Sequence, residues 1–195
     1  MGATNLVVAC VVAMIISWLG TPIVLKLAER VGAIDKPDDR KIHIRPIPRL
    51  GGVAVFAAFI LALLVQALVN PEVSSFWVVQ REGITFFVAL LFMFLLGIWD
   101  DMKTLKAIEK LFVQIILSSL VYAAGFRVSS IPHSMIANLT QIGAIDFLIT
   151  TLWIVGVTNA INLIDGLDGL ASGVSIIASM TVSYTHLTLP TKRIV

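Results

Sequence analysis

The residues best suited to chemistry lie in two short acidic segments, each at the end of an apolar run. One is NLIDGLDGL, residues 162–170, and the other begins with Asp100 and Asp101. Carboxylate and amide oxygens are the donors that Mg²⁺ prefers, usually with one or two protein ligands beside water and substrate phosphate. Lysines that follow Asp101 would neutralise such a phosphate. The pattern predicts metal-assisted phosphoryl transfer, with Mg²⁺ as cofactor and Mn²⁺ as an alternative.

The spacing within these segments supports the same chemistry. Asp100 and Asp101 are adjacent like charges where an apolar run ends, so repulsion and desolvation favour a cationic partner. Asn159 and Asn162 are three residues apart on a predicted helix and therefore share a face. Glycines 166 and 169 allow the backbone to turn and to approach a ligand closely.

The elements that must position these residues are apolar. Hydrophobic residues make up 58% of the chain and charged residues 13%, with a mean hydropathy of +0.97, which is unusual for a soluble domain. A membrane span needs about 20 mostly apolar residues. About six runs approach this length, the last one incomplete: 3–25, 51–69, 83–99, 111–126, 147–164 and 170 onward. The predicted fold class is all-α, a polytopic helix bundle in the lipid bilayer.

The basic residues predict the orientation of these spans. Half of the 14 Lys and Arg residues lie between residues 26 and 49, and more lie between 100 and 110. The positive-inside rule places both loops, and the loop 165–169, in the cytoplasm and the N-terminus outside. We therefore expect a multi-pass protein of the cytoplasmic (inner) membrane with its active site on the cytoplasmic face. No nucleic-acid partner is expected.

The first of these loops, DKPDDRKIHIRPIPRLGG, covers residues 35–52. Its prolines predict an ordered, extended segment rather than a helix. Its basic residues could bind either lipid headgroups or a phosphate substrate. The acids Asp38 and Asp39 are expected only to solvate the loop.

Three segments in this order carry a family resemblance: the first loop, DDMKTLKAIEKL (100–111) and NAINLIDGLDGLASG (159–173). Together they resemble the polyprenyl-phosphate N-acetylhexosamine-1-phosphate transferases of glycosyltransferase family 4, which start O-antigen, enterobacterial common antigen and wall teichoic acid synthesis. The first loop is closest to the undecaprenyl-phosphate GlcNAc-1-phosphate branch. The resemblance implies that UDP-GlcNAc, a UDP-N-acetylhexosamine, and undecaprenyl phosphate give undecaprenyl-diphospho-GlcNAc and UMP, with Mg²⁺ required.

The resemblance also implies roles for individual residues. Asn162 is implied as a metal ligand and Lys110 as a phosphate-binding residue, while Asp168 faces the uridine. Asp100 or Asp101 orients or deprotonates the lipid phosphate. The other matching residues are placed with the substrate-binding set without a defined role: Asn159, Asp165, Arg40, His43 and Arg49.

The end of the sequence departs from the family pattern. Family members have about ten spans, and their later loops carry a further metal-binding acid and a histidine-rich motif that do not occur here. The segment 182–195 resembles the translation of a sequencing adapter. We therefore expect residues 1–181 to be the N-terminal part of a single transmembrane transferase domain, and this fragment to be inactive alone.

The residues are also compatible with functions other than sugar-phosphate transfer. A transporter could relay protons or cations through its carboxylates, although these acids cluster at one membrane face and transporters bind near the midplane. A non-catalytic membrane subunit and a phospho-MurNAc-pentapeptide transferase stay open as well. The sequence leaves open the sugar, the polyprenyl length and the oligomeric state, including a homodimer.

Overall fold

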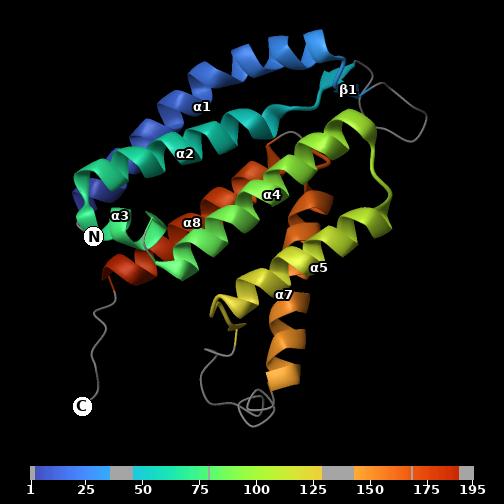
Figure 1. Cartoon of the computed structure of the whole chain (residues 1–195). Coiled ribbons are helices and arrows are strands. Elements are labelled where there is room, and N and C mark those ends of the chain that lie inside the picture. Colours follow the sequence, from blue (N-terminus) through green and yellow to red (C-terminus); the bar gives the residue numbers. More distant parts are fainter. Residues whose placement is uncertain (1–2, 36–45, 79, 129–142, 168, 189–195) are drawn as a thin grey trace, which may run out of the picture. The chain divides into compact units, whose positions relative to one another are not determined.

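The computed structural model describes residues 3–35, 46–78, 80–128, 143–167 and 169–188 (Figure 1). It forms two compact units, Met1–Phe126 and Arg127–Val195. The elements of the first unit are α1 (Ala3–Val31), β1 (Ile34–Asp35), β2 (Ile47–Pro48), α2 (Gly51–Val69), α3 (Pro71–Val78), α4 (Arg81–Lys103) and α5 (Ala107–Ala123). Those of the second unit are α7 (Gly143–Ile164) and α8 (Leu170–Thr188).

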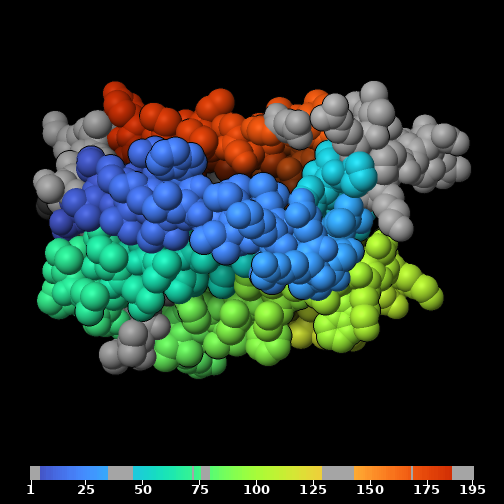
Figure 2. Space-filling model, turned by 90° about the horizontal axis from the view of Figure 1, so that it is seen from above, coloured from blue at the N-terminus to red at the C-terminus, as the bar shows by residue number. Residues whose placement is uncertain are grey.

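Helices α1 and α2 form an antiparallel pair, and Figure 2 shows their side chains in contact along one face of the molecule. Small side chains allow this close approach, which is typical of membrane helices. Near the C-terminal end of α1, the core is a cluster of buried apolar residues: Val24, Ala28, Ala33, Leu50 and Ala54. The cluster therefore lies directly beside the first loop.

An amide network joins the other ends of α1 and α2. Asn5 Nδ2 donates to Asn70 Oδ1 at 2.7 Å, and Asn70 Nδ2 donates to Gln66 Oε1 at 2.8 Å. Gln66 Nε2 donates to the Asn5 carbonyl oxygen at 2.7 Å, and Gln66 is buried. Buried amides require such partners, because an unpaired polar group in an apolar environment is costly. The network fixes the register of the two helices.

The first loop is closed at its base by a two-stranded ladder. Strands β1 and β2 are antiparallel, with Ile34 opposite Pro48 and Asp35 opposite Ile47. The Arg49 N–H then donates to the Ala33 carbonyl oxygen at 2.9 Å. The extended structure predicted for the prolines is confirmed at these residues, while residues 36–45 lie outside the described part of the chain.

Helix α4 is held against the α1–α2 pair at two points. The rings of Phe56 and Phe94 stack with centroids 3.8 Å apart and an interplanar angle of 8°. Closer to the end of α4, Ile98 packs against the buried cluster beside the first loop. This second contact brings the acidic end of α4 close to Arg49.

In the second unit, buried polar groups fix the start of α7. Asp146 Oδ2 lies 3.7 Å from Arg127 Nε, and the Val128 N–H donates to Thr150 Oγ1 at 3.2 Å. Asp146 and Thr150 are both almost fully buried. At its other end, α7 leads into a short turn in which Gly169 has a φ of 76°, before α8 begins at Leu170. That left-handed conformation is one that glycine adopts readily.

Each predicted apolar run overlaps one helix. Four helices are long and apolar enough to cross a membrane, namely Asn5–Val31, Gly51–Val69, Arg81–Lys103 and Gly143–Ile164. Helix α5 has 17 residues, and the apolar part of α8 is also shorter. The helices expose large apolar side chains such as Trp18, Leu68 and Trp153, as expected for surfaces that face lipid.

The all-α, polytopic membrane class is thus confirmed. The number of spans and the orientation of the N-terminus stay predictions. Helix α8 continues to Thr188, beyond the start of the segment 182–195. The origin of that segment also stays a prediction.

Candidate active site

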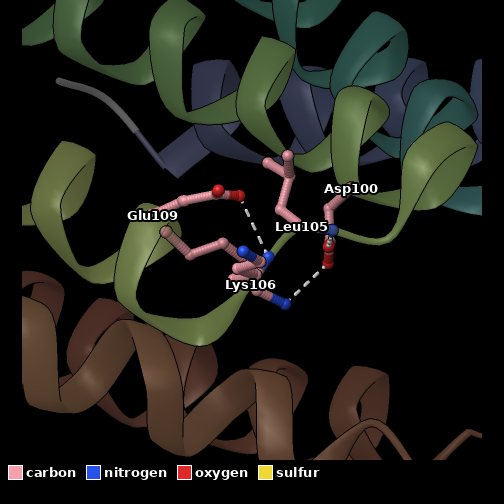
Figure 3. A network of polar contacts seen from close by, with 5 residues as sticks. Asp100, Leu105, Lys106 and Glu109 are labelled. Carbon is pink, nitrogen blue, oxygen red and sulfur yellow. Dashed lines mark hydrogen bonds and ion pairs between the residues drawn. The ribbon is translucent and has the colours of Figure 1, made fainter.

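Asp100 holds the turn between α4 and α5. Its Oδ1 accepts a hydrogen bond from the Leu105 N–H at 2.8 Å, and its Oδ2 lies 2.9 Å from Lys110 Nζ (Figure 3). Its backbone oxygen accepts the Thr104 N–H at 2.8 Å. The side chains of Asp100 and Lys110 are each 27% exposed, so the pair is accessible from outside the helices.

The start of α5 is stabilised by Glu109. Lys106 is the residue that precedes the helix, and its N–H donates to Glu109 Oε2 at 3.1 Å (Figure 3). This contact is one arm of a capping box, in which a glutamate three residues into the helix satisfies a backbone donor. The carboxylate near the helix N-terminus also interacts favourably with the helix dipole. Lys110 therefore lies on a well-defined first turn.

Arg49, from the first loop, lies near the Asp100–Lys110 pair. It is half-buried and close enough to Asp100 for a favourable electrostatic interaction. The proximity follows from the fold, because Leu50 belongs to the buried cluster that Ile98 contacts. Asp101, next to Asp100, is also half-buried. The first-loop motif and the acidic motif of α4 thus meet at one end of the first unit.

An apolar groove of about 950 Å³ runs between α4 and α5 beside this cluster. Two of the residues that line it are charged, Lys103 and Glu109. The others are apolar: Phe92, Leu95, Leu96, Ile98, Trp99, Met102, Leu105 and Val113. Lys103 Nζ lies 5.7 Å from the centroid of the Trp99 ring, within the range of a cation–π interaction. A groove of this composition is suited to a hydrocarbon chain that ends in a polar group.

In the second unit, the predicted site residues lie at the C-terminal end of α7 and in the turn that follows. Asn159 Nδ2 donates to the Val155 carbonyl oxygen at 2.8 Å, which directs its amide along the helix. Asn162 and Asp165 are exposed. Within the described ranges, no three His, Cys, Asp or Glu side chains come together as a metal site would require.

Comparison with known proteins decides the family. The profile of glycosyl transferase family 4 matches residues 83–194, more than half of the chain. The chain belongs to glycosyl transferase family 4. No solved structure matches it.

Several curated proteins are similar to this chain. A Bacillus subtilis protein named probable undecaprenyl-phosphate N-acetylglucosaminyl 1-phosphate transferase is 34% identical over 94% of this chain and 49% of its own length. The Thermotoga maritima undecaprenyl-phosphate alpha-N-acetylglucosaminyl 1-phosphate transferase is 34% identical over 89% of this chain and 50% of its own. The Mycobacterium tuberculosis decaprenyl-phosphate N-acetylglucosaminephosphotransferase is 31% identical over 87% of this chain and 42% of its own length. The chain spans about half the length of these relatives or less.

The structure places the predicted site residues in both units, and their roles stay predictions. The first unit brings together Arg49, Asp100 and Lys110, with Asp101 as the next residue of α4. Asn159, Asn162 and Asp165 gather at one end of α7 in the second unit. Arg40, His43 and Asp168 lie outside the described residues.

Sequence reasoning missed the contacts that organise the turn. The Leu105 N–H, which binds Asp100, is a backbone group and leaves no signal in the residue types. Glu109 could have been found, because a glutamate three residues after a helix boundary is a capping pattern. The groove between α4 and α5 was also missed, since its lining residues do not differ from those of any lipid-facing helix.

Proposed function

We propose that this chain belongs to an enzyme that transfers N-acetylglucosamine 1-phosphate from UDP-GlcNAc to a polyprenyl phosphate. An oxygen of the lipid phosphate attacks the β-phosphorus of the nucleotide sugar. The bond from that phosphorus to the bridging oxygen breaks, and UMP leaves with this oxygen. The products are a polyprenyl diphosphate-linked sugar and UMP, and the reaction takes place at the cytoplasmic face of the membrane.

One observation carries the proposal: in a family 4 chain, basic residues and carboxylates meet where an apolar helix ends, beside an apolar groove. The ammonium of Lys110 has three donors. One donor pairs with Asp100, and the others bind a phosphate oxygen of the substrate. Arg49 adds positive charge at the same place. A phosphate monoester is already largely ionised near neutral pH, so positioning and charge compensation contribute more than proton removal.

The groove between α4 and α5 supports a lipid acceptor. Its apolar walls suit the isoprenoid chain. Its charged residues, Lys103 and Glu109, are close in the amino-acid sequence to Asp100 and Lys110. A lipid held in this way would present its phosphate to Lys110 at the end of the helix. The names of the relatives, which specify undecaprenyl or decaprenyl phosphate, support the same class of acceptor.

The polar residues at the end of α7 suit a magnesium ion. Asn162 and Asp165 are exposed oxygen donors, and Mg²⁺ typically takes one or two protein ligands and keeps water and phosphate oxygens. When bound, Mg²⁺ would neutralise the diphosphate of the sugar nucleotide. Asp168, the further acid of this motif, contributes contacts to the uridine.

The test is a donor comparison with the complete gene product purified in detergent. With undecaprenyl phosphate and Mg²⁺ present, we expect the enzyme to release UMP from UDP-GlcNAc. Release from UDP-GalNAc and from UDP-MurNAc-pentapeptide should be much slower. Omission of the lipid phosphate or of Mg²⁺ should stop release. Preference for UDP-MurNAc-pentapeptide would assign the chain to the other branch of the family. Absence of release from all three donors would leave a transporter or a non-catalytic subunit as the better description.

A further inference from the structure

The side chain of Asp100 makes its contacts across the turn between α4 and α5. Both carboxylate oxygens of Asp100 are engaged within the protein, one by the Leu105 N–H and the other by Lys110 Nζ. Successive residues on a helix do not face each other, so Asp101 points to a different side of α4.

The turn that Asp100 holds has an unfavourable backbone conformation. Thr104 has a φ of 40°, and it is the one residue other than glycine with a positive φ in the described part of the chain. A β-branched residue rarely adopts this region, and such a conformation persists only where its surroundings enforce it. Asp100 supplies two of the enforcing contacts, because its backbone oxygen accepts the Thr104 N–H and its side chain accepts the Leu105 N–H.

The same carboxylate restricts Lys110. A lysine side chain has a flexible four-carbon stem and loses its position easily when its ammonium is unpaired. Asp100 Oδ2, 2.9 Å from Nζ, fixes one of the three donors and leaves the ammonium partly exposed. The Leu105 N–H in the turn and the ammonium of Lys110 on the first full turn of α5 are thus bound by the same side chain.

We infer that Asp100 is a positioning residue, which locks the α4–α5 turn and aims Lys110 at the substrate phosphate. The inference rests on the proposed function for the identity of the phosphate. The hydrogen bonds by which Asp100 stabilises the turn do not depend on which phosphate compound binds. Asp100 therefore acts through Lys110 and does not take up a proton during the reaction.

The test compares Asp100→Asn with Asp100→Ala in the complete gene product. Asparagine keeps an oxygen for the Leu105 N–H but loses the ionic contact with Lys110, so the KM for polyprenyl phosphate should rise about tenfold with a smaller change in kcat. Alanine loses both contacts and should be clearly less active than asparagine. The fall in rate at acid pH, which forms the acid limb of the pH–rate profile, should still be present in Asp100→Asn. Equal and near-complete loss in both variants, with that limb abolished, would show that Asp100 is the proton acceptor and overturn the inference.

Amide hydrogen exchange at Leu105 provides a readout that is independent of activity. Exchange should accelerate strongly in Asp100→Ala and little in Asp100→Asn, because only alanine removes the acceptor of this N–H. Unchanged exchange in Asp100→Ala would overturn the hold on the turn, whatever the kinetics. A protein that shows the expected exchange but transfers no sugar phosphate with any substrate would instead contradict the proposed function.

Discussion

At the scale of single residues, the candidate site is a set of charges that compensate one another at the end of an apolar helix. Asp100 is paired with Lys110 at 2.9 Å and interacts with Arg49, which offsets the desolvation of a half-buried carboxylate. Asp101 is equally half-buried and follows directly on the same helix. The family resemblance of the two acidic motifs implies that Asp101 and Asp168 contact substrate, and these roles stay predictions.

The substitutions Asp101→Asn and Asp168→Asn should each lower the rate of sugar-phosphate transfer by about two to three orders of magnitude. Each change removes a fixed charge from a transfer site, and such preorganised charges contribute strongly to catalysis. The measurement is the initial rate of UMP release by the complete gene product at saturating substrates. Asp38→Asn in the first loop is the matched control and should change the rate little. Wild-type rates in both of the first two variants would mean that these motifs maintain structure only.

At the scale of elements, the α1–α2 pair is the frame that places the acidic end of α4. Its apolar cluster contacts Ile98, and its amide network at the opposite end fixes the register through buried Gln66. A shift of α1 against α2 would move the cluster, and with it the contact that brings Arg49 to Asp100. The network is thus distant from the candidate site but supports its geometry.

The substitution Gln66→Ala should reduce the free energy of unfolding by about 1–2 kcal/mol, because it removes two hydrogen bonds and leaves Asn5 and Asn70 with unsatisfied groups. The measurement is a denaturant titration in mixed detergent micelles. Gln80→Ala is the control, since Gln80 is exposed and no hydrogen bond of its side chain occurs among the described residues. Equal effects of the two substitutions would contradict a stabilising role for the network.

The sequence was sufficient to predict the helices but not their contacts. Uncharged runs such as 51–69 and 147–164 have the length of membrane spans, and each is helical. The contacts depend on pairs distant in sequence, such as Phe56 with Phe94, which no local pattern specifies. The same limit applies to the site. Its acids and lysines could be chosen by type and spacing, whereas the pairing of Lys110 with Asp100 occurs across a turn whose left-handed residue, Thr104, no local pattern predicts.

At the scale of the whole molecule, the orientation in the membrane determines which substrates the site can reach. The basic residues of the loops 26–49 and 100–110 predict a cytoplasmic site. A reporter that is active only in the cytoplasm should work when it is fused after Arg45 or Lys106, and it should fail after Asn70 or Pro132. The opposite pattern would place the candidate site outside the cell, where sugar nucleotides are not available.

The most direct test of the central claim follows the β-phosphorus of the sugar nucleotide. The complete gene product is incubated with UDP-GlcNAc labelled with ³²P at the β-position, undecaprenyl phosphate and Mg²⁺, and the lipid and nucleotide products are separated. Transfer of the sugar phosphate predicts that the label enters the lipid together with the sugar, while the released nucleotide is unlabelled UMP. Label recovered in UDP, with the sugar alone on the lipid, would contradict the proposed reaction, as would the absence of any labelled lipid.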